Sequence, residues 1–140
     1  MREVFQGRVW TASLAETNDL VRPEAMGAYA RHRISCVLTV GRDVRPACVS
    51  TLPNLCLPVD EQGATPNAFF DLACAFHLAM GPVLVHCNAG VNRSRVFAAA
   101  LLFHVWHMGL DDAIRLADPP PSIVLSSMRT WALNGPKYLR

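Results

Sequence analysis

Residues 83–94, VLVHCNAGVNRS, are the stretch that decides the fold of this 140-residue chain. The opening VLVH is a short continuous apolar run, which is typical of a strand buried on both faces. A helix rich in Ala, Leu and Phe is expected to begin at Ser94, so residues 87–93 form a short loop between a strand and a helix. In open α/β sheets, ligands bind at the carboxyl ends of the strands. The sequence therefore predicts a binding loop at residues 87–93.

Strand-like and helix-like segments alternate on either side of this loop. Apolar, β-branched runs predict strands at residues 34–40 and 55–59, and residues 4–12 predict one or two short strands interrupted at Gly7. Apolar residues at helical spacing predict helices, for which the expected ranges are 24–31, 67–80, 94–108, 110–116 and 122–139. Gly109 is expected to end the predicted helix at residues 94–108 as its C-cap. We therefore expect a single α/β domain over residues 1–140, with a central, mainly parallel sheet of four to five strands and helices on both faces.

The composition argues against several classes of protein. Hydrophobic residues make up 51% of the chain and charged residues 17%, which suits one apolar core. The net charge of +2 comes without a basic run, so no nucleic-acid partner is expected. The apolar segment at residues 96–108 is broken by histidines and is too short to span a bilayer, so we expect no membrane partner. These observations favour a soluble monomer.

The cysteines indicate a reducing compartment. There are five of them, an odd number, and no two have the Cys-x-x-Cys spacing of a zinc or redox site. We therefore expect a cytoplasmic protein. Four of the five lie in or near apolar segments and are interpreted as core residues: Cys36, Cys48, Cys56 and Cys74.

The fifth cysteine begins the predicted loop. A loop of this length can curl so that its amides point inward and bind the oxygens of a phosphate, with Gly90 free to adopt a positive φ. The same amides and the N-terminus of the following helix would stabilise a thiolate at Cys87. At the other end of the loop, the planar fork of Arg93 can hold two phosphate oxygens. This arrangement favours attack of the sulfur on phosphorus to give a phosphocysteine.

The string HCNAGVNRS, with the pattern H-C-x5-R-S, resembles the signature of the protein tyrosine phosphatase superfamily and looks most like the small dual-specificity phosphatases. The resemblance covers roughly residues 7–131. It implies that Cys87 is the nucleophile, that Arg93 is the phosphate clamp, and that Ser94 eases expulsion of the thiolate. It also implies that His86 supports the loop and the thiolate indirectly. The residues that would supply mainly backbone amides to the phosphate are Asn88, Ala89, Gly90, Val91 and Asn92.

The resemblance also implies a general acid on the loop that precedes the Phe-rich helix at residues 67–80. Such a group protonates the leaving oxygen and contributes about 10²–10⁴-fold to the rate. Both Asp60 and Glu61 lie in this loop, and the spacing from Asp60 to Phe70 matches the family, so we favour Asp60 over Glu61. Arg95 stands where the family usually has Gly or Ala; it either adds positive potential at the mouth or faces solvent.

The function predicted from this resemblance is a dual-specificity protein phosphatase, a hydrolase acting on phosphotyrosine and on phosphoserine or phosphothreonine in a protein or peptide. No metal or cofactor is expected, because Arg93 and the loop amides neutralise the phosphate. One alternative keeps the chemistry but acts on a phosphoinositide or an RNA 5′ phosphate; the absence of Lys from the loop speaks against it. Another alternative is an inactive module that binds phosphorylated partners. A third is a rhodanese-type sulfur transferase, which is a poor match to the Arg–Ser pair at the end of the loop motif.

Overall fold

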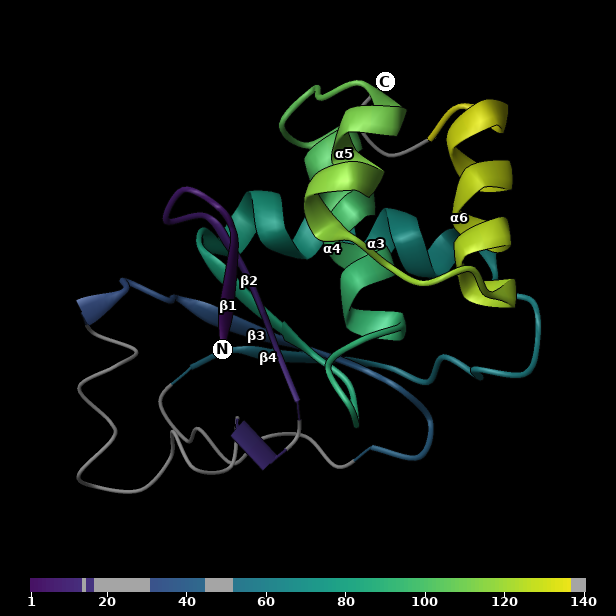
Figure 1. Cartoon of the computed structure of the whole chain (residues 1–140). Helices are drawn as coiled ribbons and strands as arrows, with labels where there is room; N and C mark the ends of the chain where they lie inside the picture. The colour runs from purple at the N-terminus through teal and green to yellow at the C-terminus, as the bar shows by residue number, and fades with distance from the viewer. Residues whose placement is uncertain (14, 17–30, 45–51, 137–140) are drawn as a thin grey trace.

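The computed structural model describes residues 1–13, 15–16, 31–44 and 52–136, and its architecture is a five-stranded sheet with helices packed against it (Figure 1). The strands are β1 (Arg2–Phe5), β2 (Val9–Ala12), β3 (Cys36–Val40), β4 (Asn54–Leu57) and β5 (Val83–His86). Their order in the sheet is β1-β2-β5-β3-β4. Strand β1 is antiparallel to β2, and all the other pairs are parallel. The predicted α/β fold with a mainly parallel sheet is therefore confirmed.

Strand β5 occupies the centre of this sheet. Every residue of β2, β3 and β5 is buried, as expected for apolar runs that are covered on both faces. The parallel registers place His86, the last residue of β5, beside Ala12 of β2 and Thr39 of β3. The residue that follows, Cys87, therefore leaves the sheet at the middle of its carboxyl edge.

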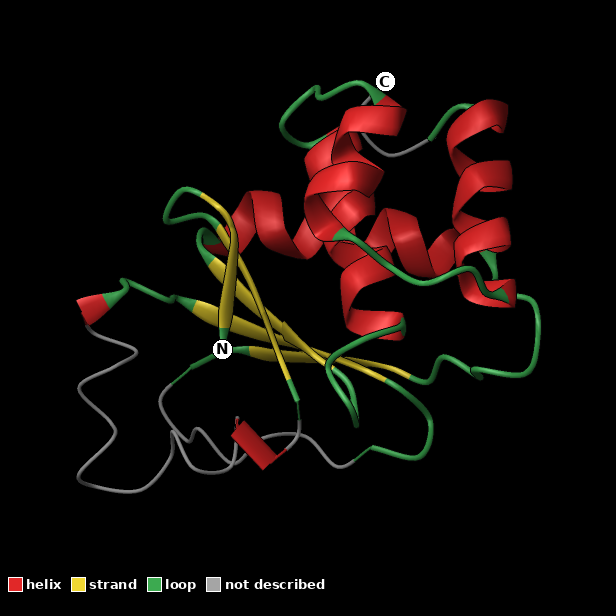
Figure 2. Ribbon diagram, viewed as in Figure 1, coloured by secondary structure: helices red, strands yellow, loops and turns green. Residues whose placement is uncertain are grey.

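Four helices lie together on one side of the sheet (Figure 2). They are α3 (Asn67–Met80), α4 (Arg93–His104), α5 (Leu110–Ala117) and α6 (Ile123–Asn134). Helix α4 is the central one: it contacts α3, α5 and α6 as well as the three inner strands. The predicted helix at residues 24–31 falls almost entirely outside the described residues, so helical cover on the second face of the sheet stays a prediction.

Aromatic side chains fix the helices to one another. Phe70 of α3 is fully buried, and its ring stacks on Phe97 of α4 with the centroids 4.7 Å apart. Trp131 of α6 packs on Phe70 at 5.2 Å, and its indole nitrogen donates a hydrogen bond of 2.9 Å to Asp71. Each such aromatic pair adds about 0.5–1.5 kcal/mol beyond the apolar area that it buries. This cluster holds α4, and therefore the start of α4, in a fixed position above the sheet.

Three expectations from the sequence are wrong in detail. Helix α4 ends at His104 with Val105 as its C-cap, and Gly109 is instead the N-cap of α5, with φ −57° and ψ 144°. Helix α6 ends at Asn134, before a Gly135 at φ 78°, rather than continuing to residue 139. Cys56 is exposed rather than in the core, because β4 is an edge strand. Cys48 lies outside the described residues.

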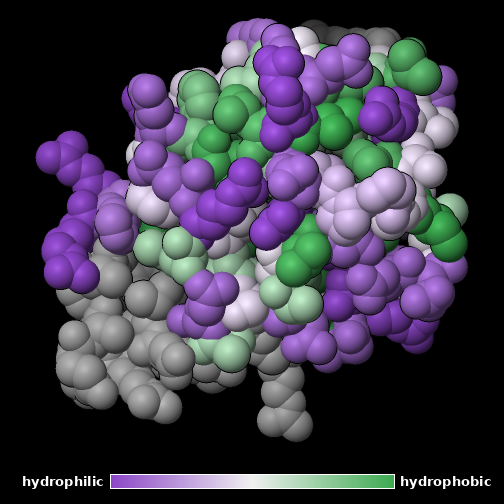
Figure 3. Space-filling view, in the orientation of Figure 1, coloured by the Kyte–Doolittle hydropathy of each residue, from purple (hydrophilic) through white to green (hydrophobic). Residues whose placement is uncertain are grey.

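The surface seen in Figure 3 mixes polar and apolar side chains. Green apolar groups show over the helical half of the molecule, separated by purple polar side chains. The large hydrophobic residues that are exposed come from several elements, and they include Leu72, Leu78, Val91, Leu116, Ile123 and Leu133. Within the described part of the chain, no helix has the length and apolarity needed to cross a membrane.

Candidate active site

The predicted loop lies between the end of β5 and the start of α4. Its last residue before the helix, Asn92, is the N-cap of α4. Gly90 has φ 74°, and a Cβ at this position would lie 2.7 Å from the backbone nitrogen of Ser13. Any other residue would therefore be strained and would also collide with the end of β2. The free amides at the start of the 12-residue helix α4 point toward this loop. The loop is therefore a suitable binding site for an anion.

Cys87 is at the start of this loop, 2% exposed. Its Sγ lies 3.4 Å from the hydroxyl oxygen of Ser94, which is fully buried in the first turn of α4. Because Asn92 takes the N-cap position, capping of the helix does not explain Ser94. The pair is arranged so that the hydroxyl can donate a hydrogen bond to the sulfur once the sulfur is negatively charged.

The guanidinium of Arg93 is buried beside the loop. Its Nη1 contacts the carboxylate of Asp43 and donates to the carbonyl oxygen of Val59 at 3.4 Å. The Nε donor is buried and has no partner among the described residues. Room for the group comes from Gly41, since a Cβ there would lie 2.7 Å from Nη1. Arg93 therefore provides a fixed cation with a free N–H that can bind an anion.

The charges of Arg93 and Asp43 stabilise each other. Burial alone would lower the pKa of Arg93, but the hydrogen bond and charge of Asp43 outweigh it and raise that pKa. In turn, the hydrogen bond from Arg93 lowers the pKa of Asp43. Both groups are therefore charged at neutral pH. Nothing in the sequence pattern singled out Asp43, which precedes the undescribed residues 45–51.

His86 is buried at the sheet edge behind the loop. Its Nε2 lies 2.7 Å from the hydroxyl of Thr39, which donates to Asn54 Oδ1 at 3.1 Å. Because that hydroxyl already donates, it accepts from His86, which assigns the ring proton to Nε2. Burial lowers the pKa of His86 to about 4, so the ring is neutral at pH 7. This fits the indirect supporting role predicted for it.

The two candidate acids lie on the loop after β4. Asp60 Oδ1 accepts from the backbone N–H of Gln62 at 2.9 Å, and its Oδ2 is 3.7 Å from Arg42. Glu61 Oε1 accepts from the side chain of Asn92 at 3.0 Å. Both carboxylates line a cavity of about 370 Å³ together with Arg93. The structure therefore brings both candidates close to Arg93, with Glu61 hydrogen-bonded to Asn92 and Asp60 held by its own turn and by Arg42.

Asn92 has a second role that sequence reasoning missed. Its side-chain oxygen accepts from Ser122 at 2.8 Å, and Ser122 in turn caps α6 by accepting from the N–H of Leu125 at 3.1 Å. Asn92 thus joins the binding loop to the acid loop on one side and to α6 on the other. A local signal existed in the Ser that follows three prolines, which is a common helix start.

Arg95 neither lines the cavity described above nor simply faces solvent. Its Nε donates to the carbonyl oxygen of Gly90 at 3.3 Å, and its Nη1 donates to the carbonyl oxygen of Asp118 at 3.2 Å. The side chain therefore braces the loop against the segment between α5 and α6.

Comparison with solved structures supports the same fold over nearly the whole chain. Human DUSP28 matches with a TM-score of 0.78 and 20% identity, covering 96% of this chain and 98% of that one. The dual-specificity phosphatase fold is the fold of this chain. Within it, the human tyrosine phosphatase-like serine/threonine/tyrosine-interacting protein matches with a TM-score of 0.75, 18% identity and 96% coverage of both chains. PTPMT1 in complex with PI(5)P matches with a TM-score of 0.68 and 20% identity, covering 96% and 94%.

At this level of identity the likeness concerns the fold. No family model and no curated protein matches the chain by sequence. Within the dual-specificity phosphatase fold, the chemistry of this chain therefore depends on its own residues. Among the described residues, no group of three or more His, Cys, Asp or Glu side chains is placed so that it could hold a metal ion.

Proposed function

We propose that the chain is a cysteine-dependent phosphatase that forms a phosphocysteine at Cys87. One observation carries the proposal. A buried sulfur with a hydroxyl at 3.4 Å and a buried guanidinium with a free N–H flank one loop at a helix N-terminus. That set provides a nucleophile, a phosphate clamp and a donor for the departing sulfur. We further propose a single-domain, monomeric, cytoplasmic enzyme that acts without a cofactor.

The first half of the reaction transfers the phosphoryl group to the protein. Arg93 and the amides of residues 88–92 bind the phosphate oxygens, which places phosphorus in line with Cys87 Sγ. The Cys87 thiolate forms the S–P bond as the P–O bond to the substrate breaks, and Asp60 donates its proton to the leaving oxygen. The dephosphorylated substrate then departs.

The second half regenerates the enzyme. Asp60, now ionised, takes a proton from water as the water oxygen attacks phosphorus. The S–P bond breaks, inorganic phosphate forms, and the sulfur leaves as a thiolate. Ser94 donates a hydrogen bond to that thiolate, which makes the sulfur a better leaving group. His86 is neutral and buried, so it positions the end of β5 without exchanging a proton.

The charges around the cavity favour phosphorylated proteins or peptides as substrates. Three carboxylates, those of Asp43, Asp60 and Glu61, share the cavity with Arg93 and Arg42. A substrate that brings several further negative charges would be repelled at this mouth. This counts against an RNA 5′ phosphate or a phosphoinositide, although one protein of the same fold was solved with PI(5)P. We propose phosphotyrosine and phosphoserine or phosphothreonine side chains as substrates.

The rival proposal, a module that binds phosphorylated partners without turnover, is weaker. One structural neighbour is described as phosphatase-like, so the fold alone does not decide between the two functions. In this chain the sulfur, the guanidinium and a carboxylic acid are all present. A pure binding module would need only the guanidinium and the amides.

Hydrolysis of an aryl phosphate in the presence of a metal chelator tests the proposal. Cys87→Ser should abolish turnover but keep binding of tungstate, whereas Arg93→Ala should lose both. Cys56→Ser is the matched control, because Cys56 is exposed on the edge strand β4, which β3 separates from β5. Acid-quench mass spectrometry should find phosphate on Cys87. Turnover by Cys87→Ser at the rate of the unchanged protein would overturn the mechanism, and binding without any turnover would favour the rival.

A further inference from the structure

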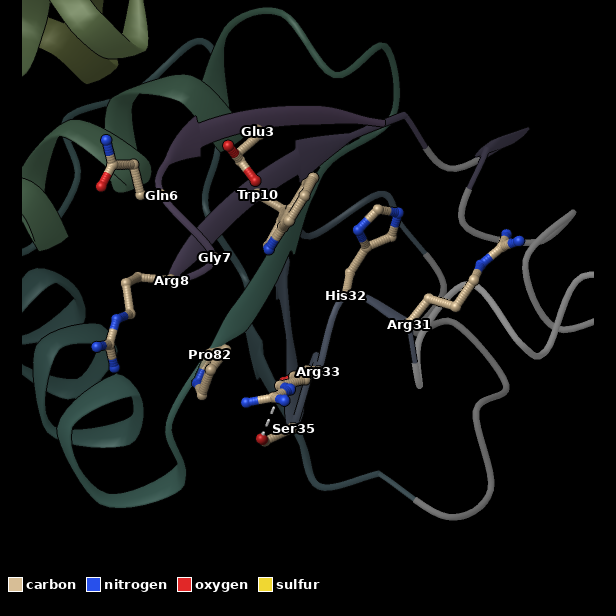
Figure 4. Close-up of a pocket in the computed structure, with 10 residues that line it drawn as sticks. All are labelled: Glu3, Gln6, Gly7, Arg8, Trp10, Arg31, His32, Arg33, Ser35 and Pro82. Carbon is tan, nitrogen blue, oxygen red and sulfur yellow. Dashed lines mark hydrogen bonds between the residues drawn. The ribbon is translucent and has the colours of Figure 1, made fainter.

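A second polar cavity lies at the opposite end of the sheet from Cys87. Its volume is about 630 Å³, within the range of small-molecule sites. It borders the residues just before β2, β3 and β5, whereas the candidate active site follows the last residue of β5 (Figure 4). A four-residue strand spans roughly 13 Å, so one phosphate cannot occupy both places. The residues that line this rear cavity include Arg8, Trp10, Arg31, His32, Arg33 and Ser35.

The floor of the rear cavity has a hydrogen-bond donor without an acceptor. Trp10 is 6% exposed, and its indole Nε1 is buried with no partner among the described residues. Figure 4 shows this nitrogen turned toward the open centre of the labelled group, with the ring of His32 beside it. The two rings are tilted, with their centroids 4.5 Å apart. A buried N–H is rarely left unpaired in a native protein, so this donor points to a missing acceptor.

The walls of the rear cavity are basic. Three arginines line it, Arg8, Arg31 and Arg33, against the single carboxylate of Glu3. Within the described part of the chain, none of these arginines has an ion-pair partner. In Figure 4, Arg8 and Arg31 extend to opposite sides, and Arg33 lies next to Ser35 between them. Arg33 is therefore placed for direct contact with a ligand, while the outer two raise the positive potential.

We propose that the rear cavity binds a phosphate group, separately from the phosphate that Cys87 attacks. Its charged side chains are three cations against one carboxylate, and its buried indole N–H is an unpaired donor, so the cavity calls for an anionic ligand made of acceptors. These donors come from the β1–β2 turn, from β2 and from the segment before β3, so they reach the ligand from several sides. A tetrahedral phosphate has oxygens in diverging directions and fits this better than a planar carboxylate. The phosphate can belong to a phosphorylated protein segment or to a small phosphate compound.

The indole N–H signal of Trp10 in an NMR spectrum reports on this site, and Trp10→Phe assigns it. The probes are pyrophosphate and a phosphoserine peptide, the peptide being added to the Cys87→Ser protein so that it is not hydrolysed. We expect a saturable shift of the signal, and an affinity about tenfold lower in Arg33→Gly, because a charged hydrogen bond is lost. A response to pyrophosphate alone identifies a small phosphate as the ligand, and a tighter response to the peptide identifies a protein segment.

Arg33→Gly also separates binding from folding. Arg33 has φ 56°, which glycine adopts at lower cost, so this variant should be at least as stable as the unchanged protein. Arg129→Gln removes the same charge from an exposed position on α6 and should leave the affinity unchanged. The proposal is overturned by a Trp10 signal that no probe moves, by an equal response to a glutamate version of the peptide, or by full affinity in Arg33→Gly. None of these readouts requires turnover, so they are independent of the chemistry at Cys87.

Discussion

The carboxylate of Asp43 accepts a hydrogen bond from Nη1 of Arg93, the group that we propose clamps the substrate phosphate. The side chain of Arg93 is 4% exposed and that of Asp43 is 57% exposed, so the carboxylate reaches the buried cation from the solvent side. An arriving phosphate meets this negative charge, and like charges repel each other. Asp43 is therefore both the partner of the clamp and a competitor for it.

Asp43→Asn should strengthen substrate binding. The amide has nearly the same shape but no charge, so the repulsion disappears while a neutral hydrogen bond to Arg93 can remain. Because Asp43 is largely exposed, we expect KM for an aryl phosphate to fall only about two- to fivefold, with kcat unchanged. Steady-state kinetics measure both values, with Asp111→Asn on α5 as the control. A higher KM in Asp43→Asn would show instead that Asp43 is needed to position Arg93.

Asp60→Asn should slow the reaction in proportion to how poor the leaving group is. If Asp60 is the acid, its loss should reduce kcat by about 10²-fold for an alkyl phosphate and far less for a nitrophenyl phosphate. Glu61→Gln should be close to the unchanged protein with both, since glutamine keeps the oxygen that accepts from Asn92. A series of phosphate esters of graded leaving-group pKa gives the comparison. The opposite ranking of the two variants would assign the acid to Glu61.

Asn92→Ala should uncouple the acid loop from the phosphate-binding loop. Its side chain bridges Glu61 and Ser122, so its loss frees the segment that holds Asp60. We expect kcat for poor leaving groups to fall about tenfold, with a smaller change for good ones. Glu61→Ala should behave similarly, and the double variant should be no worse than either single one. Equal losses for all leaving groups would show that Asn92 only supports the fold.

His86 should make the protein less stable in acid. Its pKa is about 4 when folded, against 6.5 ordinarily, so the unfolded chain binds the extra proton first as the pH falls. The contribution of neutral His86 to the free energy of unfolding is fully present above pH 6.5 and is lost progressively toward pH 4. Between pH 7 and pH 5 this amounts to about 2 kcal/mol of unfolding free energy.

Denaturant titrations at the two pH values measure that loss. His86→Gln, which can still donate to Thr39 and does not titrate, should lose less stability over this interval. Its unfolding curve at pH 7 serves as the reference for any packing change. Identical losses in the two proteins would mean that His86 is not the group that titrates.

The sequence predicted best the parts of the fold that depend on local pattern. The buried strand at residues 83–86 and the helix at residues 67–80 have the predicted ends, because a continuous apolar run and a long amphipathic repeat are strong local signals. The end of α4 was harder to predict. Its apolar pattern continues past His104, and the chain leaves the helix without a glycine at the C-cap.

The candidate site also contains some contacts that the local sequence predicts and others that it does not. Cys87, Ser94 and Arg93 share one short loop and the turn of helix after it, so the motif alone brings them together. Asp43 is fifty residues earlier and reaches Arg93 only because β3 and β5 are parallel neighbours that end at the same edge. The link from Asn92 to Ser122 depends likewise on how α6 packs beside α4. Contacts of this kind have no signal in the order of residues.

The close approach of Gly90 to the end of β2 sets limits on how the loop can be redesigned. Libraries aimed at new substrates can vary residues 88, 89 and 91, whose side chains are exposed. Position 90 should accept no replacement, since any Cβ there would collide with the backbone at the end of β2. Within the phosphate-binding loop, the side chains that can be changed to alter specificity are therefore those on either side of one glycine that must be kept.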